Sequence, residues 1–262
     1  MKLSISNIAW SREQDESVYF AMKQNGFTGL EIAPTRWFPE APYEHIGDAQ
    51  KKASCLKKEY GFQIVSLQSI WYGKTENIWT SEEEREELEK YTKKAVDFAS
   101  ALECGNLVFG CPKNRNRPEG ADETEIIHFF GRLADYAGAR HTVVSLEANP
   151  PIYQTNYLNR TTDALELVKS VGKAGIGINL DVGTMISNGE SIYSLEEIWP
   201  YINHVHVSEP YLKPIQKRSL HAELAGALRD HGYQGYVSVE MSNENDADLV
   251  VKTMEYIAGV FG

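Results

Sequence analysis

Four residues in the second half of the chain have side chains suited to binding a metal ion: Glu147, Asp181, His206 and Glu240. Each lies at or near the end of a short run in which Val, Ile or Leu alternates with other residues. Side chains alternate between the two faces of a β-strand, so an outward apolar set leaves all four pointing inward. Three buried carboxylates would repel one another, and a divalent cation removes that conflict. Three carboxylates and one imidazole suit Mn²⁺, Mg²⁺ or Co²⁺ in octahedral geometry, or Zn²⁺ less regularly.

Each acid could instead be paired separately with Lys or Arg in a structural network. For a single inward Glu, that interpretation is the better one. Four consecutive strands that each end in the same way favour a shared cation. Four protein ligands would leave two positions for oxygen atoms of a substrate.

These residues belong to a regular alternation of strands and helices along the whole chain. The pattern predicts strands at residues 2–8, 29–33, 63–68, 106–110, 142–147, 176–181, 204–208 and 236–240. It predicts helices at residues 16–25, 48–60, 82–102, 123–140, 163–171, 195–201, 220–231 and 246–261. Eight such pairs predict a parallel α/β fold, the (β/α)₈ TIM barrel, as a single domain over residues 1–262. An open doubly wound sheet is the alternative, but no glycine follows the first strand, where the sequence reads NIAWS.

Composition narrows the classes of function. The 262 residues carry 26 Lys and Arg against 37 Asp and Glu, a net charge of −11, which argues against binding of nucleic acid. No apolar run is long enough for a membrane helix, and the first residues do not resemble a signal peptide, so we expect a cytoplasmic protein. The three cysteines predict no disulfide, because Cys104 and Cys111 flank a strand and would lie roughly 23 Å apart. The sequence is compatible with a homo-oligomer.

The chain resembles the sugar phosphate isomerase/epimerase superfamily, the xylose isomerase-like TIM barrels. The similarity begins with NGFTGLEI at residues 25–32 and ends with GYQGYVSVE at residues 232–240. Between them lie SLEAN at residues 145–149, NLDVG at residues 179–183 and HVHVSE at residues 204–209. The resemblance implies the same four metal ligands and assigns Glu147 and Glu240 as the acid/base pair. Two positions depart from epimerase-like members: Thr184 stands where they often carry His, and Lys213 or Arg218 is the nearest cation where they tend to have Arg.

The resemblance implies an isomerase or epimerase acting on a small sugar, a sugar phosphate or a related keto-polyol. Glutamate would abstract a proton next to a carbonyl, through a metal-stabilised enediolate. A metal-dependent dehydratase of the inosose or dehydroshikimate type is the alternative on the same site. A DNA-repair endonuclease and a metal-free sugar-binding barrel are further alternatives. The small number of histidines in the first five strands and the negative charge count against the endonuclease.

Five further residues are candidates for binding the carbohydrate substrate: Glu31, Gln68, Trp71, Lys113 and Glu209. Glu31 and Gln68 point inward by alternation, and either could bind a sugar hydroxyl, orient His206 or be a satisfied core group. Trp71 would offer an apolar wall to a sugar ring, although single tryptophans in loops are commonly structural. Lys113 would hold a phosphate or carboxylate, or it belongs to a solvated basic loop. Glu209 would contact the substrate or orient the metal-bound histidine.

Overall fold

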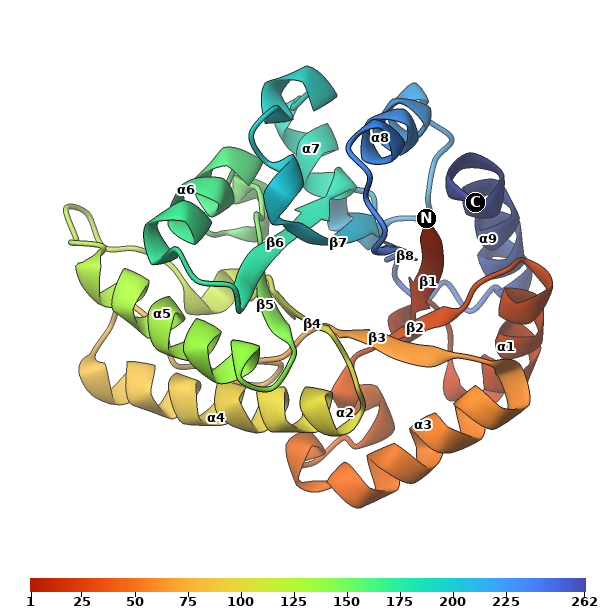
Figure 1. The fold of residues 1–262 in the computed structure, drawn as a ribbon, viewed down its shortest axis with the longest axis horizontal. Coiled ribbons are helices and arrows are strands. Elements are labelled where there is room, and N and C mark those ends of the chain that lie inside the picture. Colours follow the sequence, from red (N-terminus) through yellow and green to blue (C-terminus); the bar gives the residue numbers. More distant parts are fainter.

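Eight parallel strands close into one barrel, with helices around the outside (Figure 1). The computed structural model describes all residues, 1–262. Strand order around the barrel follows the sequence, and β8 pairs with β1 to close it. The strands are β1 (Lys2–Ser6), β2 (Gly29–Ile32), β3 (Gln63–Leu67), β4 (Asn106–Phe109), β5 (Val143–Glu147), β6 (Ile176–Asp181), β7 (Ile202–Val207) and β8 (Tyr236–Val239). The structure confirms the expected (β/α)₈ barrel.

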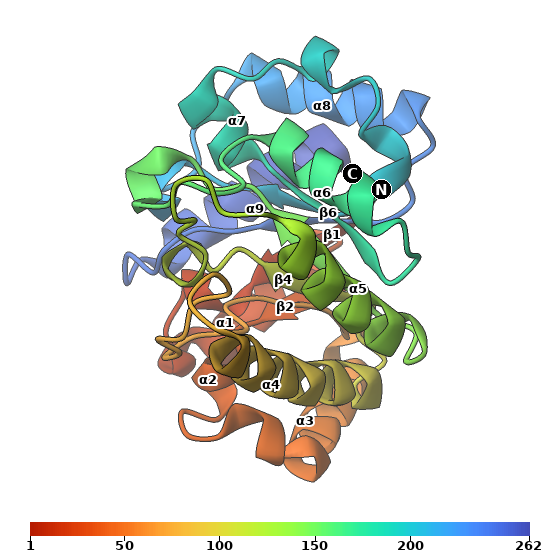
Figure 2. The ribbon, with the colours of Figure 1, turned by 90° about the vertical axis from the view of Figure 1, so that its left-hand side faces the viewer.

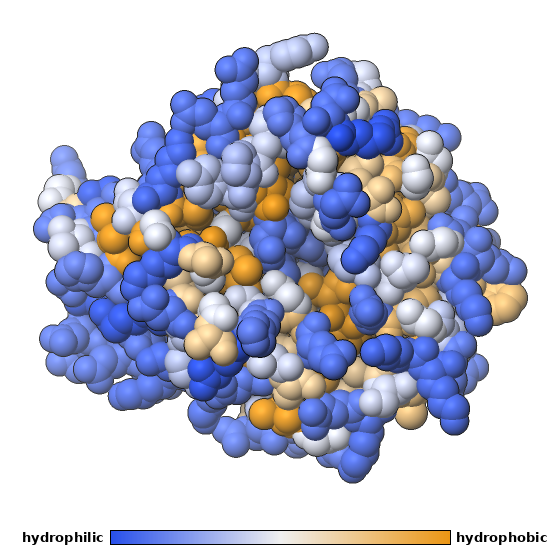
Figure 3. Space-filling model, in the orientation of Figure 1, coloured by the Kyte–Doolittle hydropathy of each residue, from blue (hydrophilic) through white to orange (hydrophobic).

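Most of the helices cover the strands from outside. They are α1 (Asp15–Gln24), α2 (Pro34–Trp37), α3 (Ile46–Tyr60), α4 (Glu82–Ala101), α5 (Thr124–Gly138), α6 (Thr161–Val171), α7 (Val182–Asn188), α8 (Ser219–Asp230) and α9 (Ala247–Phe261). One continuous core of 66 buried apolar residues joins the helices to the strands. Hydrophilic side chains cover most of the face seen in Figure 3. None of the helices combines the length and the apolar character needed to cross a bilayer.

Parallel pairing brings the carboxyl ends of all strands to the same end of the barrel. Figure 2 shows the longer loops there, opposite the end where the two chain termini lie. Register then sets which side chains become neighbours. Asp181 of β6 pairs with His206 of β7, and Glu147 of β5 pairs with Asn179 of β6.

The prediction of a helix over residues 195–201 is wrong. Two short 3-10 turns, Ile192–Leu195 and Trp199–Tyr201, occupy this region, because Pro200 cannot donate a backbone hydrogen bond to continue a helix. The helix that follows β6 is instead α7, which begins directly after Asp181. The carboxylate of Asp181 accepts a hydrogen bond from the backbone N–H of Thr184 at 2.7 Å, which is the usual arrangement at a helix start.

Candidate active site

The structure brings the four predicted metal ligands together at the carboxyl end of the barrel. Glu147 and Asp181 are the last residues of β5 and β6, His206 is the penultimate residue of β7, and Glu240 follows β8. One potential ligand atom from each residue lies within 4.8 Å of those of the other three. All four residues are at most 9% exposed. Four neighbouring strands with the same alternation therefore form one cluster.

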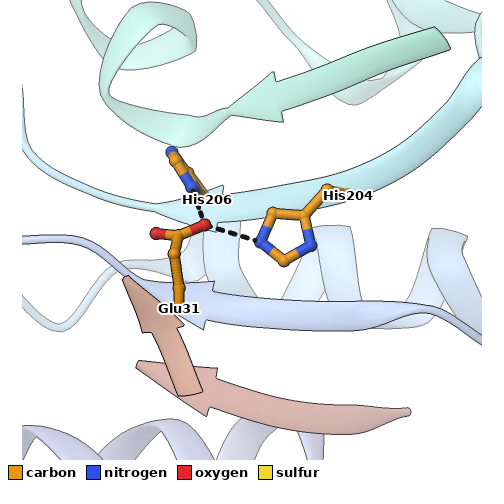
Figure 4. A group of neighbouring side chains, drawn as sticks. All are labelled: Glu31, His204 and His206. Atoms are coloured by element: carbon orange, nitrogen blue, oxygen red, sulfur yellow. Dashed lines mark hydrogen bonds and ion pairs between the residues drawn. The ribbon is translucent and has the colours of Figure 1, made fainter. Parts of the chain in front are cut away.

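His206 is oriented by Glu31 from across the barrel (Figure 4). Its Nε2 lies 2.9 Å from Oε2 of Glu31, and Nε2 of His204 lies 3.1 Å from the same oxygen. The other ring nitrogen of His206, Nδ1, therefore faces the acidic cluster, 3.0 Å from Oε2 of Glu147 and 3.3 Å from Oε2 of Glu240. Metal-binding histidines are commonly held in this way, with a carboxylate on the second ring nitrogen.

The surroundings of Nδ1 fit a divalent cation. This buried nitrogen has no hydrogen-bond partner, although two carboxylate oxygens lie close to it, so their alignment is not that of a hydrogen bond. A cation among them would accept all three atoms as ligands. One imidazole nitrogen and three carboxylates are donors that Mn²⁺, Mg²⁺, Co²⁺ and Zn²⁺ all use.

Neighbouring polar groups fix the carboxylates in turn. The side-chain amide of Asn149 donates to Oε1 of Glu147 at 3.0 Å, and that of Asn179 donates to Oε2 at 2.5 Å. The hydroxyl of Ser208 donates to Oδ1 of Asp181, and the backbone of Thr184 donates to Oδ2. Each of these two acids is thus held at both oxygens before any ligand binds.

Burial and the crowding of charges shift the pKa values of the cluster. Burial, with the nearby charge of Glu147, raises the pKa of Asp181 to about 6. Burial likewise raises the pKa of Glu240 to about 7. Burial alone would lower the pKa of His206, but Glu31 and Glu240 outweigh it and raise that pKa well above its ordinary value. A bound cation would displace the protons that these groups hold.

A cavity of about 210 Å³ opens beside the cluster. Its wall combines acidic, polar and apolar residues. The lining residues are Ile8, Gln68, Ser69, Val108, Gly110, Cys111, Pro112, Glu147, Asn149, Tyr153, Asp181, Leu212 and Glu240. No Lys or Arg side chain is among them. The cavity suits a small molecule with several hydroxyl or carbonyl oxygens.

The five predicted substrate-binding residues are scattered. Gln68 lines the cavity, where its amide donates to the hydroxyl of Ser6 at 2.7 Å. Glu31 is fully buried behind His206, outside the lining. Trp71 packs in the core, 2% exposed, and its indole N–H donates to Thr92 at 2.7 Å.

Lys113 and Glu209 also lie outside the cavity lining. Lys113 is exposed on the loop after β4. Glu209 is 3% exposed and pairs with Arg218, whose Nε and Nη2 lie 2.7 and 2.6 Å from its two oxygens. This pair connects the end of β7 to the start of α8 and engages both oxygens of Glu209.

Sequence reasoning missed several residues that the structure places at the site, and three of them show why. Asn149 contacts Glu147, and Tyr153 and Leu212 line the cavity. All three lie on loops, where strand alternation gives no information. Only their place in the sequence could have indicated them, because each lies within six residues of the end of a strand that carries a proposed ligand.

Comparison with solved structures finds other proteins with the same fold. The E. coli 3-keto-D-glucoside 4-epimerase superposes with a TM-score of 0.78 at 20% identity, over 99% of both chains. The D-allulose 3-epimerase of Methylomonas sp. gives 0.78 at 19% identity, over 99% of this chain and 97% of that one. A probable 3-DHS dehydratase of Bacillus anthracis gives 0.68 at 18% identity, over 97% and 98%. A search of curated proteins finds no match. The profile of the xylose isomerase-like TIM barrel family matches residues 20–259, and the chain therefore belongs to that family.

Proposed function

We propose that this protein is a divalent-metal-dependent isomerase or epimerase of a small keto sugar or related keto-polyol. The observation that carries the proposal is the buried Nδ1 of His206, which has no hydrogen-bond partner and faces two carboxylate oxygens of a four-residue cluster. Epimerases among the similar structures support the class of reaction. These epimerases share at most 20% sequence identity with this chain. The substrate is therefore inferred from the residues that line the cavity.

The proposed chemistry is proton transfer next to a carbonyl group. A divalent cation at the cluster would polarise the carbonyl oxygen of the substrate. Glu147 would remove the proton from the adjacent carbon, and Glu240, on a different side of the barrel mouth, would return a proton to the opposite face of that carbon. In an aldose–ketose isomerisation, one carboxylate would carry the proton between neighbouring carbons. Hydrogen bonds from Asn149 and Asn179 hold the carboxylate of Glu147 in place for this step.

We propose an unphosphorylated substrate. The cavity wall offers amide, hydroxyl and carboxylate groups together with apolar side chains, but no cation. A phosphate inside it would lie near the acidic cluster without a balancing side chain, which is costly. Lys113 is the basic residue proposed for a charged substrate, and it would act from outside the lining. Comparison of a free ketose with its phosphate ester, in the wild type and in Lys113→Ala, tests this point.

The direct test combines metal removal with isotope exchange. We expect chelated protein to be inactive, Mn²⁺ or Co²⁺ to restore turnover, and ketoses incubated in D₂O to gain deuterium at the carbon that reacts. Glu147→Gln and Glu240→Gln should each lower kcat by about 100-fold or more, because general acid–base groups contribute about 10²–10⁴-fold. Circular dichroism serves as the control for folding. Near wild-type turnover in either variant would contradict the acid/base assignment.

A dehydratase is the second candidate, favoured by the similarity to the probable 3-DHS dehydratase. The same two carboxylates would then remove a proton and protonate a leaving hydroxyl. A new ultraviolet absorbance, with loss of water from a cyclic keto-polyol and no epimer formed, would support it over the epimerase.

A further inference from the structure

Arg115 is a fully buried cation beside the candidate active site that forms no ion pair with any carboxylate. It lies on the loop after β4, and its guanidinium reaches the end of β5. Nη1 donates to the backbone oxygen of Glu147 at 2.9 Å, and Nη2 donates to Oδ1 of Asn149 at 3.0 Å and to the backbone oxygen of Leu158 at 3.2 Å. A charge is rarely buried in this way without a specific use.

The contact with Arg115 decides which way the Asn149 amide points. A guanidinium only donates hydrogen bonds, so Asn149 must turn its oxygen toward Arg115. Its NH₂ group then points the other way and donates to Oε1 of Glu147 at 3.0 Å. The contacts with Arg115 and Glu147 together therefore determine the orientation of the Asn149 amide.

The two oxygens of Glu147 have different surroundings. Oε2 lies 3.0 Å from Nδ1 of His206, on the side of the proposed cation. Oε1 lies on the side of Gly110, a residue of the cavity wall, where an added Cβ would come within 2.9 Å of it. Rotation of the carboxylate plane would move both oxygens out of these positions, and the hydrogen bond from Asn149 to Oε1, with that from Asn179 to Oε2, opposes that rotation.

We propose that Arg115 and Asn149 are positioning residues that fix the rotation of the Glu147 carboxylate, so that Oε2 faces the cation and Oε1 faces the substrate. The inference rests on the proposed function. Arg115 acts through Asn149 and the backbone of Glu147, without contact to the substrate. Groups that orient metal ligands in this way commonly change affinity or activity by about 10–100-fold when replaced.

Asn149→Asp is the most informative variant. It keeps the shape of the side chain and gives Arg115 a carboxylate partner, which favours folding. It replaces the N–H that faces Oε1 of Glu147 by an oxygen. We expect kcat on a responsive ketose to fall about 10–100-fold, with KM changed less than threefold. The visible absorption spectrum of the Co²⁺-loaded protein should shift, because a ligand has moved.

Asn156→Asp is the matched control. Asn156 joins the same two loops, donating to the backbone oxygen of Arg117 at 2.9 Å and accepting from its N–H, and it does not contact Glu147. It should keep the wild-type kcat and Co²⁺ spectrum. Arg115→Lys should reproduce part of the loss in kcat, and the double variant with Asn149→Asp should lose no more than Asn149→Asp alone.

The outcomes separate this inference from the proposed function. Wild-type protein that binds Co²⁺ and turns over substrate, with Asn149→Asp unchanged in kcat and spectrum, would overturn the positioning role alone. An equal loss in Asn156→Asp would also overturn it, because joining the loops would then explain the effect. Wild-type protein that binds no Co²⁺ would overturn the proposed function, and the positioning role with it.

Discussion

Replacement of Glu31 by Gln tests the support of the metal site from across the barrel. Oε2 of Glu31 lies within 3.1 Å of both His206 and His204, and Oε1 is buried without a partner. Glutamine keeps the shape of the side chain but removes the negative charge that makes the imidazole of His206 a stronger electron-pair donor to a metal ion. Carboxylates on metal-bound histidines contribute about 10–100-fold in affinity, which corresponds to about 1.4–2.8 kcal/mol. The new NH₂ group would also lie unpaired at the position of Oε1, which costs about 1–3 kcal/mol of unfolding free energy.

Calorimetric titration of metal-free protein with Mn²⁺, together with thermal denaturation, measures both effects. Glu89→Gln is the matched control, because Glu89 is another mostly buried glutamate, 2.7 Å from both Lys93 and Arg132 on the outside of the barrel. We expect Glu89→Gln to lower the free energy of unfolding without changing the affinity for Mn²⁺. Wild-type affinity in Glu31→Gln, or an equal loss of affinity in Glu89→Gln, would refute the orienting role of Glu31.

Three further predictions follow from the site and its surroundings. Affinity for Mn²⁺ should fall as the pH decreases from 8 to 6, by about tenfold per pH unit for each proton that the cation displaces. His206, whose pKa is raised well above its ordinary value, gives up one proton, and Glu240 and Asp181, with pKa values of about 7 and 6, add theirs as the pH decreases; titrations at pH 8, 7 and 6 that agree would contradict this. Gly110→Ala should lower kcat by about tenfold or more, because its Cβ would meet Oε1 of Glu147 at 2.9 Å, whereas Gly105→Ala, with open space around its Cβ, should not. Trp71→Phe should lower the free energy of unfolding by about 1–3 kcal/mol through the lost hydrogen bond to Thr92, and an increase in KM in place of that loss would show that the indole contacts substrate.

The alternation of side chains along the strands was sufficient to predict the barrel and the inward direction of the four proposed metal ligands. Asp181 and His206 each follow an apolar residue that packs outward, so the sequence determines their faces independently of the loops. The same reasoning placed Glu31 inward. It could not distinguish a substrate contact from the support of His206, because that depends on how deep each side chain lies in the barrel.

The positions of loop side chains could not be predicted in this way, because loop conformations depend on contacts between segments distant in sequence. Arg115 follows Lys113 on the loop after β4, and no sequence pattern indicated that its guanidinium is buried against the end of β5. Trp71 lies shortly after the end of β3, and the loop turns it into the core against Phe109, with ring centroids 4.8 Å apart. The missed helix α7 is short, and its capping residue, Asp181, was already assigned to the metal site.

The division of the cavity between the two halves of the barrel bears on how such proteins diversify. The four proposed ligands come from β5 to β8, whereas Ile8, Gln68 and the segment from Val108 to Pro112 come from the first half. Recombination that exchanged the loops after β1 and β3 would therefore alter which molecule is accepted while sparing the proposed ion-binding centre. Two contacts cross between the halves. β2 must be inherited together with β7 for His206 to keep Glu31 as its partner, and the loop after β4 together with β5 for Glu147 to keep its contact with Arg115.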